Sequence, residues 1–347
     1  MKHKILIESH VPFTEGLFDG VADVAVLRPE EFTRERLIEE GADAILVRTR
    51  TRCDATLLEG TAVTAAATAT IGTDHIDIPY CEANGIKVIN APGCNAPAVA
   101  QYVFATALRA IGATKPESLT LGVVGTGHVG AIVARWGRQL GFNVLECDPP
   151  RAERESGYHS ETLAAIAEKA DIITFHTPHT KSGAHPTHHL ADQAFFASLR
   201  RKPLVINSAR GPVVDTEAML DAIDWGLVGG VITDCWEGEP RISLPLLGAS
   251  LFATPHIAGY SLEGKKRATQ MTANALLAHF GSDRRVDLGI APGAAETVTA
   301  EAITASYDPA ADTAELREAF ADAADTEAAA KAFEHLRDSY NLRSEVR

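Results

Sequence analysis

The chain has 347 residues, of which 46% are hydrophobic and 22% charged, and this ordinary globular composition excludes a largely disordered or collagen-like protein. Acidic residues outnumber basic ones by 46 to 32, and the net charge of −14 argues against nucleic acid or an anionic membrane surface as the main partner. The five cysteines are scattered without a C-x-x-C pair, and the longest uncharged run, residues 88–108, is too polar for a membrane span. We therefore expect a cytoplasmic protein with reduced thiols and no membrane partner.

Short β-branched runs alternate with helical patterns along most of the chain. A first series of predicted strands lies at residues 4–7, 24–27, 44–47, 63–67 and 87–89. A second series lies at residues 119–124, 143–147, 172–175, 204–207, 228–233 and 251–253. Strand–helix alternation is typical of a parallel sheet covered on both faces, so the two series predict an α/β protein with two doubly wound, Rossmann-like or flavodoxin-like domains.

Two long helical patterns mark where one domain gives way to the other. The first, at residues 98–111, follows Pro92, Gly93 and Pro97, and the second begins just after Tyr260. If the second helix returns to the first domain, that domain is discontinuous, and the pattern leaves this open. After Asp287 the composition becomes rich in Ala, Glu, Asp and Thr but keeps a helical rhythm, which predicts a small C-terminal helical extension; a loosely attached acidic tail is the alternative.

The strongest motif lies at a predicted strand-to-helix junction and reads Gly125-Thr126-Gly127-His128-Val129-Gly130. In a G-x-G-x-x-G sequence with this context, the first glycine permits a tight turn and the second lets a pyrophosphate approach the backbone. The third allows close packing of helix on strand, and the helix N-terminus supplies amide donors to the phosphates. Asp148 ends the next predicted strand, at about the spacing expected for the carboxylate that binds the ribose hydroxyls, which favours NAD over NADP. Arg151 nearby keeps NADP open as an alternative.

Three further polar side chains follow later strands, at the edge where open α/β sheets bind their ligands. Arg210 can pair with a substrate carboxylate in a bidentate manner. Glu239 and His256 form a candidate acid–base pair, because a carboxylate orients an imidazole and stabilises its protonated form. Each residue alone is more typical of a solvated loop, and it is the set of three downstream of a nucleotide motif that indicates a catalytic site.

The order of these motifs resembles the NAD-dependent D-2-hydroxyacid dehydrogenase family. Segments 68–75, 90–95, 147–151, 175–178 and 256–260 are similar to a subgroup of that family that acts on a phosphorylated sugar acid, and the similarity extends over residues 4–280. The resemblance implies an NAD-binding domain inserted between two segments of a substrate-binding domain, with a cleft between the domains and a homodimeric assembly. The implied boundaries are 1–97 and 259–286 for the two segments of the substrate-binding domain, 98–258 for the NAD-binding domain, and 287–347 for an extension that is a candidate dimerisation element.

The same resemblance assigns roles to individual residues. It implies Arg210, Glu239 and His256 as the catalytic set, acting on a small phosphorylated 2-hydroxy acid with NAD as cofactor. It adds cofactor contacts to those of the glycine-rich motif, at Asp148, Thr177, Ser208, Ala209, Arg210, Asp234 and Gly259. It also implies substrate contacts at Thr49, Thr70 and Tyr260, and the local basicity of Arg48 beside Thr49 makes Arg48 our candidate for binding the substrate phosphate.

Two alternatives in function and one in metal chemistry stay open. The enzyme could act on a different 2-hydroxy acid, since the catalytic residues are shared across the family, or the chain could be an NAD-sensing binding protein on the same fold. Five histidines crowd residues 176–189 and raise the question of a metal, but none stands in a recognised H-E-x-x-H or Cys/His pattern. We predict no metal.

Overall fold

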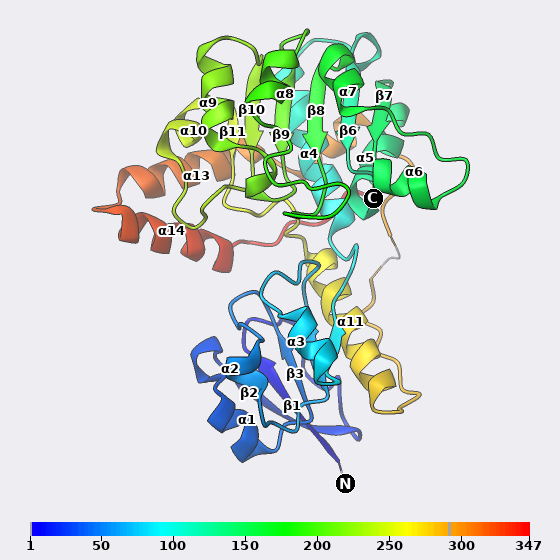
Figure 1. Ribbon diagram of the computed structural model, residues 1–347, viewed down its shortest axis with the longest axis vertical. Helices are drawn as coiled ribbons and strands as arrows, with labels where there is room; N and C mark the ends of the chain where they lie inside the picture. The colour runs from blue at the N-terminus through cyan, green and yellow to red at the C-terminus, as the bar shows by residue number, and fades with distance from the viewer. Residues whose placement is uncertain (1, 291–292) are drawn as a thin grey trace. The chain divides into compact units, whose positions relative to one another are not determined.

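Eleven parallel strands form two separate sheets within the described residues, 2–290 and 293–347, of the computed structural model (Figure 1). The chain divides into two compact units, the first made of the described residues of Met1–Asn95 and Ser261–Pro292, and the second of Ala96–Tyr260 and Gly293–Arg347. The predicted α/β fold with two parallel sheets is confirmed. The first unit is discontinuous because the long helix after Tyr260 belongs to it.

The first unit has the strand order β2-β1-β3-β4-β5. Its strands are β1 (His3–Glu8), β2 (Ala22–Leu27), β3 (Ala44–Val47), β4 (Ala65–Thr68) and β5 (Lys87–Ile89). Its helices are η1 (Pro29–Glu31), α1 (Arg34–Glu40), α2 (Ala55–Leu58), α3 (Ile78–Ala83) and α11 (Leu262–His279). Successive strand residues face opposite sides of the sheet, so Ile5 and Ile7 pack in the core with α11, while Leu6 packs in the core with α1, α2 and α3.

The second unit has the strand order β11-β10-β9-β8-β6-β7, again all parallel. Its strands are β6 (Thr120–Val124), β7 (Asn143–Cys147), β8 (Ile172–Phe175), β9 (Leu204–Asn207), β10 (Gly230–Thr233) and β11 (Phe252–Ala253). Its helices are α4 (Ala96–Ile111), η2 (Pro116–Ser118), α5 (His128–Gln139), α6 (Pro149–Arg154), α7 (Leu163–Lys169), α8 (Gln193–Ser198), η3 (Gly211–Val213), α9 (Thr216–Asp224), α10 (Leu244–Ala249), α12 (Ala300–Ser306), α13 (Pro309–Ala321) and α14 (Thr326–Asp338). One core lies between the sheet and α4, α5 and α12, and the other between the sheet and α7 to α10 with α13 and α14.

Strand positions agree with the sequence patterns to within two residues at either end. The pattern at 63–67 is a strand only from Ala65, although the amide of Thr64 already donates to Asp43 O at 2.8 Å. The pattern at 228–233 is a strand only from Gly230.

None of the helices in residues 2–290 and 293–347 combines the length and the apolar character needed to cross a membrane.

The C-terminal extension is helical and packs within the second unit (Figure 1, orange to red). Leu316 of α13 and Phe333 of α14 are completely buried in the core beneath α8 to α10. Beyond α14, Arg343 donates to three backbone carbonyls, those of Ile257, Ala258 and Ala98, and stacks on the ring of Tyr307 at 4.4 Å. The extension is therefore an integral layer of this unit.

We expect Arg343→Met to destabilise the second unit by about 2–5 kcal/mol, because three buried carbonyls lose their donor. Thermal denaturation followed by near-UV circular dichroism measures this loss. Lys331→Met, at an exposed position of α14, is the matched control and should leave the transition unchanged. An Arg343 variant as stable as the control would show that the extension is held by its apolar contacts alone.

Candidate functional site

The glycine-rich loop joins β6 to α5 and has the geometry of a dinucleotide site. Gly125 has a φ of 85°, in the left-handed region that favours glycine. A Cβ on Gly130 would overlap the carbonyl oxygen of Gly125, so the third glycine is required for close packing of helix on strand. By contrast, apart from its neighbours in the chain, no atom of residues 2–290 and 293–347 lies within 4 Å of a Cβ placed on Gly127, the N-cap of α5. The space beside the helix N-terminus is therefore open for a phosphate group.

Buried hydroxyl groups without protein partners face the same edge of the sheet. The strand order reverses between β6 and β8, the switch point at which doubly wound sheets bind nucleotides. Just beyond β8 and β9, Thr177 Oγ1 and Ser208 Oγ are buried and make no hydrogen bond to any described residue. Buried polar groups are normally satisfied, so these two hydroxyls fit a site completed by a bound ligand. Burial lowers the pKa of the neighbouring His176 to about 3, so its imidazole is neutral there.

Asp148 lies at the end of β7, as the spacing predicts, but within the chain its carboxylate already has partners. Oδ2 accepts from the Thr126 amide at 2.8 Å, and Oδ1 accepts from the Arg151 amide at 3.0 Å as the N-cap of α6. The side chain of Arg151 donates to Thr126 O at 3.1 Å and stacks on the ring of Tyr158 at 4.2 Å. This places one carboxylate and one guanidinium beside the glycine-rich loop, where the ribose end of a dinucleotide would bind.

Glu239 and His256 come together as predicted. Nδ1 of His256 lies 2.8 and 2.9 Å from the two carboxylate oxygens of Glu239, so Nε2 is the nitrogen that can exchange a proton with a substrate. Both side chains are partly exposed, His256 by 29% and Glu239 by 23%, as an acid–base pair must be to reach a ligand. Hydrogen-bond contact through one ring nitrogen orients the imidazole and fixes its tautomer.

The electrostatics of this pair favour the imidazolium–carboxylate form. Burial by itself lowers the pKa of His256, but the Cys235 sulfur and the Glu239 carboxylate outweigh it and raise that pKa well above its ordinary value. Burial raises the pKa of the Cys235 thiol. Burial also acts to raise the pKa of Glu239, yet His256, then Arg337 and Arg210, hold it below its usual range.

A buried carboxyl group holds the His256 loop in place. Asp234 Oδ1 accepts from the amides of Ile257 at 2.8 Å and Ala258 at 3.0 Å, and from the hydroxyl of Thr254 at 2.7 Å. His256 itself has a φ of 57°, a left-handed conformation that is uncommon for a residue with a side chain. The bonds to residues on either side keep it there. Asp234 is a predicted NAD contact; its hydrogen bonds within the chain support the loop, and the NAD contact stays a prediction.

Arg210 follows β9, on a turn that packs tightly against the next loop. The side-chain amide of Asn207 donates from Nδ2 to Arg210 O at 3.1 Å. Gly211 lies so close to Trp236 O that a Cβ on Gly211 would overlap that oxygen. The guanidinium donates to Ala209 O at 2.8 Å and is near enough to Glu239 to influence its pKa. The second unit therefore brings Arg210, Glu239 and His256 together, with Gly259 and Tyr260 following in the same loop.

In the first unit, three of the predicted substrate residues lie at the carboxyl edge of the sheet. Arg48 and Thr49 follow β3, next to the β1/β3 switch point, where the buried carboxylate of Glu8 accepts from the Arg48 amide at 2.9 Å. Thr70 follows the adjacent β4, and its hydroxyl donates to Gly72 O at 2.9 Å. This edge is where doubly wound sheets bind ligands. Tyr260, the fourth predicted substrate residue, belongs to the second unit.

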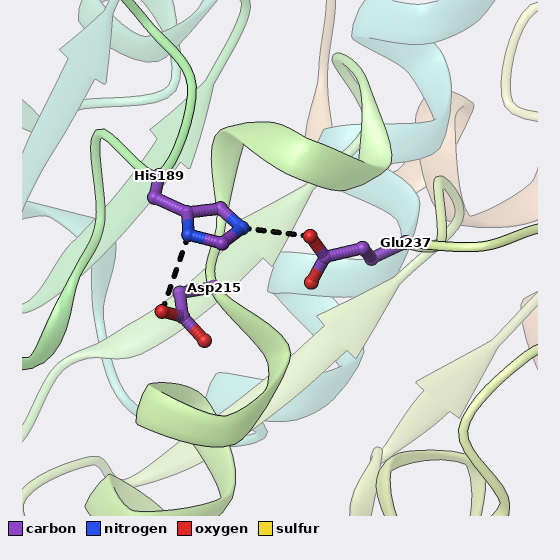
Figure 2. Close-up of side chains that lie close together, drawn as sticks. All are labelled: His189, Asp215 and Glu237. Atoms are coloured by element: carbon purple, nitrogen blue, oxygen red, sulfur yellow. Dashed lines mark hydrogen bonds and ion pairs between the residues drawn. The ribbon is translucent and has the colours of Figure 1, made fainter.

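One cluster of potential metal ligands was not predicted. His189 lies between two carboxylates, with Nδ1 3.3 Å from Asp215 and Nε2 2.7 Å from Glu237 (Figure 2). The two carboxylates contact different nitrogens of the His189 ring. A metal ion bound to one of these nitrogens would therefore leave the contact between the other nitrogen and its carboxylate in place. The geometry is that of an ion-pair bridge linking the loop after β8 to α9 and to the loop that carries Glu239. The prediction that no metal is needed remains a prediction.

Comparisons with known proteins place the chain. The family described as D-isomer specific 2-hydroxyacid dehydrogenase, NAD binding domain, matches residues 99–258. The erythronate-4-phosphate dehydrogenase of Bacteroides thetaiotaomicron is 41% identical over 99% of this chain and 97% of its own length. That of Edwardsiella ictaluri is 43% identical over 82% of this chain and 76% of its own length. Among solved structures, D-lactate dehydrogenase from Aquifex aeolicus complexed with NAD and lactic acid has a TM-score of 0.67 and 25% identity, covering 80% of this chain and 96% of that one.

The fold and the second unit are those of the NAD-dependent D-2-hydroxyacid dehydrogenases, a class of oxidoreductases, and the second unit contains their NAD-binding domain. Within that class, the chain belongs to the family of erythronate-4-phosphate dehydrogenases. The open space at Gly127 and the unpaired hydroxyls of Thr177 and Ser208 fit NAD at this site.

We expect the two alanine variants of the glycine-rich loop to separate folding from cofactor binding. Gly130→Ala should cost about 1–3 kcal/mol of stability, because its Cβ overlaps backbone. Gly127→Ala should cost about 1 kcal/mol or less, yet weaken NADH binding at least about tenfold by narrowing the phosphate site. Urea unfolding and NADH fluorescence titration measure the two effects. NADH affinity unchanged in Gly127→Ala would move the pyrophosphate away from this loop.

Proposed function

We propose that this protein catalyses the NAD-dependent oxidation of 4-phospho-D-erythronate to 2-oxo-3-hydroxy-4-phosphobutanoate, a step of pyridoxal 5′-phosphate (vitamin B6) biosynthesis. The observation that carries the proposal is the His256–Glu239 pair at 2.8 Å, next to a guanidinium and in the same unit as a dinucleotide loop. The names of the relatives supply the substrate. The proposal extends the shared chemistry of a 2-hydroxyacid dehydrogenase to one particular phosphorylated acid.

His256 serves as the general base. As the C2 hydroxyl of the substrate becomes a ketone, its proton passes to Nε2 of His256, while Nδ1 stays bonded to Glu239. The carboxylate of Glu239 stabilises the imidazolium that forms, and positioned proton transfer of this kind contributes about 10²–10⁴-fold in rate. In the direction of reduction, the same imidazolium returns the proton to the ketone oxygen.

Arg210 holds the reacting end of the substrate. Its guanidinium suits bidentate binding of the substrate carboxylate, which fixes C2 in position and stabilises negative charge on the developing oxygen. NAD, when bound, supplies the acceptor for the hydride that leaves C2. Its contacts are proposed at the loop 125–130 and at Asp148, Thr177, Ser208, Ala209, Arg210, Asp234 and Gly259.

The remaining assignments concern the substrate, the domains and the assembly. Arg48, Thr49, Thr70 and Tyr260 are proposed to bind the rest of the substrate, with Arg48 near the phosphate. Residues 1–97 with 259–286 act as the substrate-binding domain, and 98–258 as the NAD-binding domain. Residues 287–347 form the extension, for which a role in dimerisation stays open. We propose a homodimer in the cytoplasm.

The pH dependence of oxidation tests the acid–base pair. Because the base must be unprotonated, kcat/KM should rise with pH through the pKa of His256, with a midpoint above 6.5. Glu239→Gln removes the partner that favours the imidazolium, so the midpoint should move to lower pH while the plateau falls. Glu217→Gln, at an exposed position of α9, is the matched control and should change neither. A midpoint that stays in place in Glu239→Gln would contradict the pairing.

The substrate is tested with purified protein and NAD, following nicotinamide reduction, and in parallel with a 2-oxoacid acceptor added, following only the formation of 2-oxo-3-hydroxy-4-phosphobutanoate. We expect turnover of 4-phospho-D-erythronate and little or none of D-erythronate. Turnover of D-glycerate or D-lactate in excess of the phosphorylated acid would assign a different substrate to the same mechanism. NAD binding without turnover of any acid would indicate a nicotinamide-sensing protein, and turnover that survives His256→Ala would overturn the catalytic assignment.

A further inference from the structure

The C-terminal helix α14 and the residues after it pack against the loop that carries the catalytic histidine. Arg343 donates from Nη1 to Ile257 O at 3.1 Å and from Nη2 to Ala258 O. The ring of Tyr340 meets the ring of Tyr260 edge-on, with centroids 6.1 Å apart. These contacts lie wholly within the second unit. The end of the chain thus contributes to the surroundings of the His256–Glu239 pair.

Arg337, in the last turn of α14, brings a second guanidinium to this place. Its side chain is only 17% exposed, and Nη1 donates to Glu334 Oε1 at 3.1 Å. Across residues 2–290 and 293–347 the guanidinium has no other hydrogen-bond acceptor, and its Nε is buried without one. After the effects of burial and of His256, Arg337 is the next influence on Glu239, lowering the pKa of that carboxyl. Arg337 lies three residues before Tyr340, whose ring contacts Tyr260 in the loop that follows His256. Its hydrogen-bond partner is Glu334, not Glu239 or His256.

The local balance of charge favours an anionic ligand. Arg210, Arg337 and the imidazolium of His256 outnumber the carboxylates of Glu239 and Glu334, although the chain as a whole carries a net charge of −14. Burial raises the pKa of Asp234, whose carboxyl group accepts hydrogen bonds from Thr254, Ile257 and Ala258 and is thus engaged within the loop. A positive surplus beside a hydride-transfer site suits a substrate with more than one anionic group.

The proposed substrate has two such groups, a carboxylate next to C2 and a phosphate joined to C2 through C3, C4 and the ester oxygen. If Arg210 holds the carboxylate, the group that holds the phosphate must lie near the His256–Glu239 pair without replacing it. Arg337 meets this requirement, and its planar fork of donors matches the geometry of a phosphomonoester.

We propose that Arg337 binds the phosphate of the substrate and thereby selects phosphorylated over unphosphorylated 2-hydroxy acids. This inference rests on the proposed function. Arg48 in the first unit keeps its predicted role. The proposal adds a specificity-determining residue from the C-terminal extension, which lies far in sequence from any of the family motifs.

The test compares the binding of two acids by the NADH-loaded protein, using isothermal titration calorimetry with 4-phospho-D-erythronate and D-erythronate, alongside steady-state kinetics. For Arg337→Gln we expect about 10–100-fold weaker binding and a correspondingly higher KM for the phosphorylated acid, the range expected for loss of a charge-assisted hydrogen bond. The affinity for D-erythronate should change less than about threefold. Arg337→Lys, which keeps the charge but loses the fork, should fall between wild type and Arg337→Gln.

Arg241→Gln is the matched control. Arg241 forms an exposed 2.7 Å ion pair with Glu327, which lies on α14 as Arg337 does. It should leave both affinities unchanged. Equal losses for both acids in Arg337→Gln would show that Arg337 only supports Glu239, and would overturn the proposal. So would a loss of phosphate selectivity in Arg48→Gln but not in Arg337→Gln, or a wild type that binds both acids equally. Selective binding of the phosphorylated acid without turnover would instead contradict the proposed function and leave the phosphate site intact.

Discussion

The hydrogen bonds of the Asp234 carboxyl group are the interactions on which the geometry of the proposed catalytic pair depends. A single buried oxygen accepts from two consecutive amides and one hydroxyl of the loop 254–258, and so holds His256 in a left-handed backbone conformation. From that position the imidazole reaches the carboxylate of Glu239, which enters from the loop after β10. Removing water from a carboxyl group is costly unless donors replace it, and here the donors belong to the segment that must be fixed. The hydrogen bonds that satisfy the buried carboxyl group of Asp234 therefore also fix the loop that carries His256.

Neighbouring loops are joined in the same way, by contacts that each link two segments. Gly211 packs against Trp236 O, which ties the Arg210 turn to the segment leading to Glu239. The His189 bridge connects that segment to α9 and to the loop after β8, with Glu237 also accepting from the Thr216 amide at 3.3 Å. Because adjacent parallel strands end at one edge of the sheet, short loops suffice to bring these residues together. Strand order brings Arg210, Glu239 and His256 to one edge of the sheet, and the contacts between loops, with those of Asp234, then fix their positions.

Much of this arrangement could be predicted from local sequence, and the exceptions have a physical cause. The glycine-rich loop, Asp148 and the Glu239–His256 pair each follow a recognisable strand, so their positions at one sheet edge could be inferred from strand order. His189, Asp215 and Glu237 come from three segments without a shared motif, and only the folded chain brings them together. No sequence motif marks Arg337 as a functional residue either. The rhythm of residues 310–340 indicated a helix, but which surface that helix covers depends on where Leu316 and Phe333 find a core.

The anchoring of Arg343 to Ile257 and Ala258 has a consequence for how the enzyme is made. A chain synthesised from its N-terminus can form both sheets before its last residues have been translated. The carbonyls of Ile257 and Ala258 meet this donor only after residue 343 has been synthesised. The loop that carries His256 is therefore held by Asp234 and by a donor that the chain adds 86 residues after Ile257, so a chain cut before residue 343 would keep the first set of bonds and lose the second.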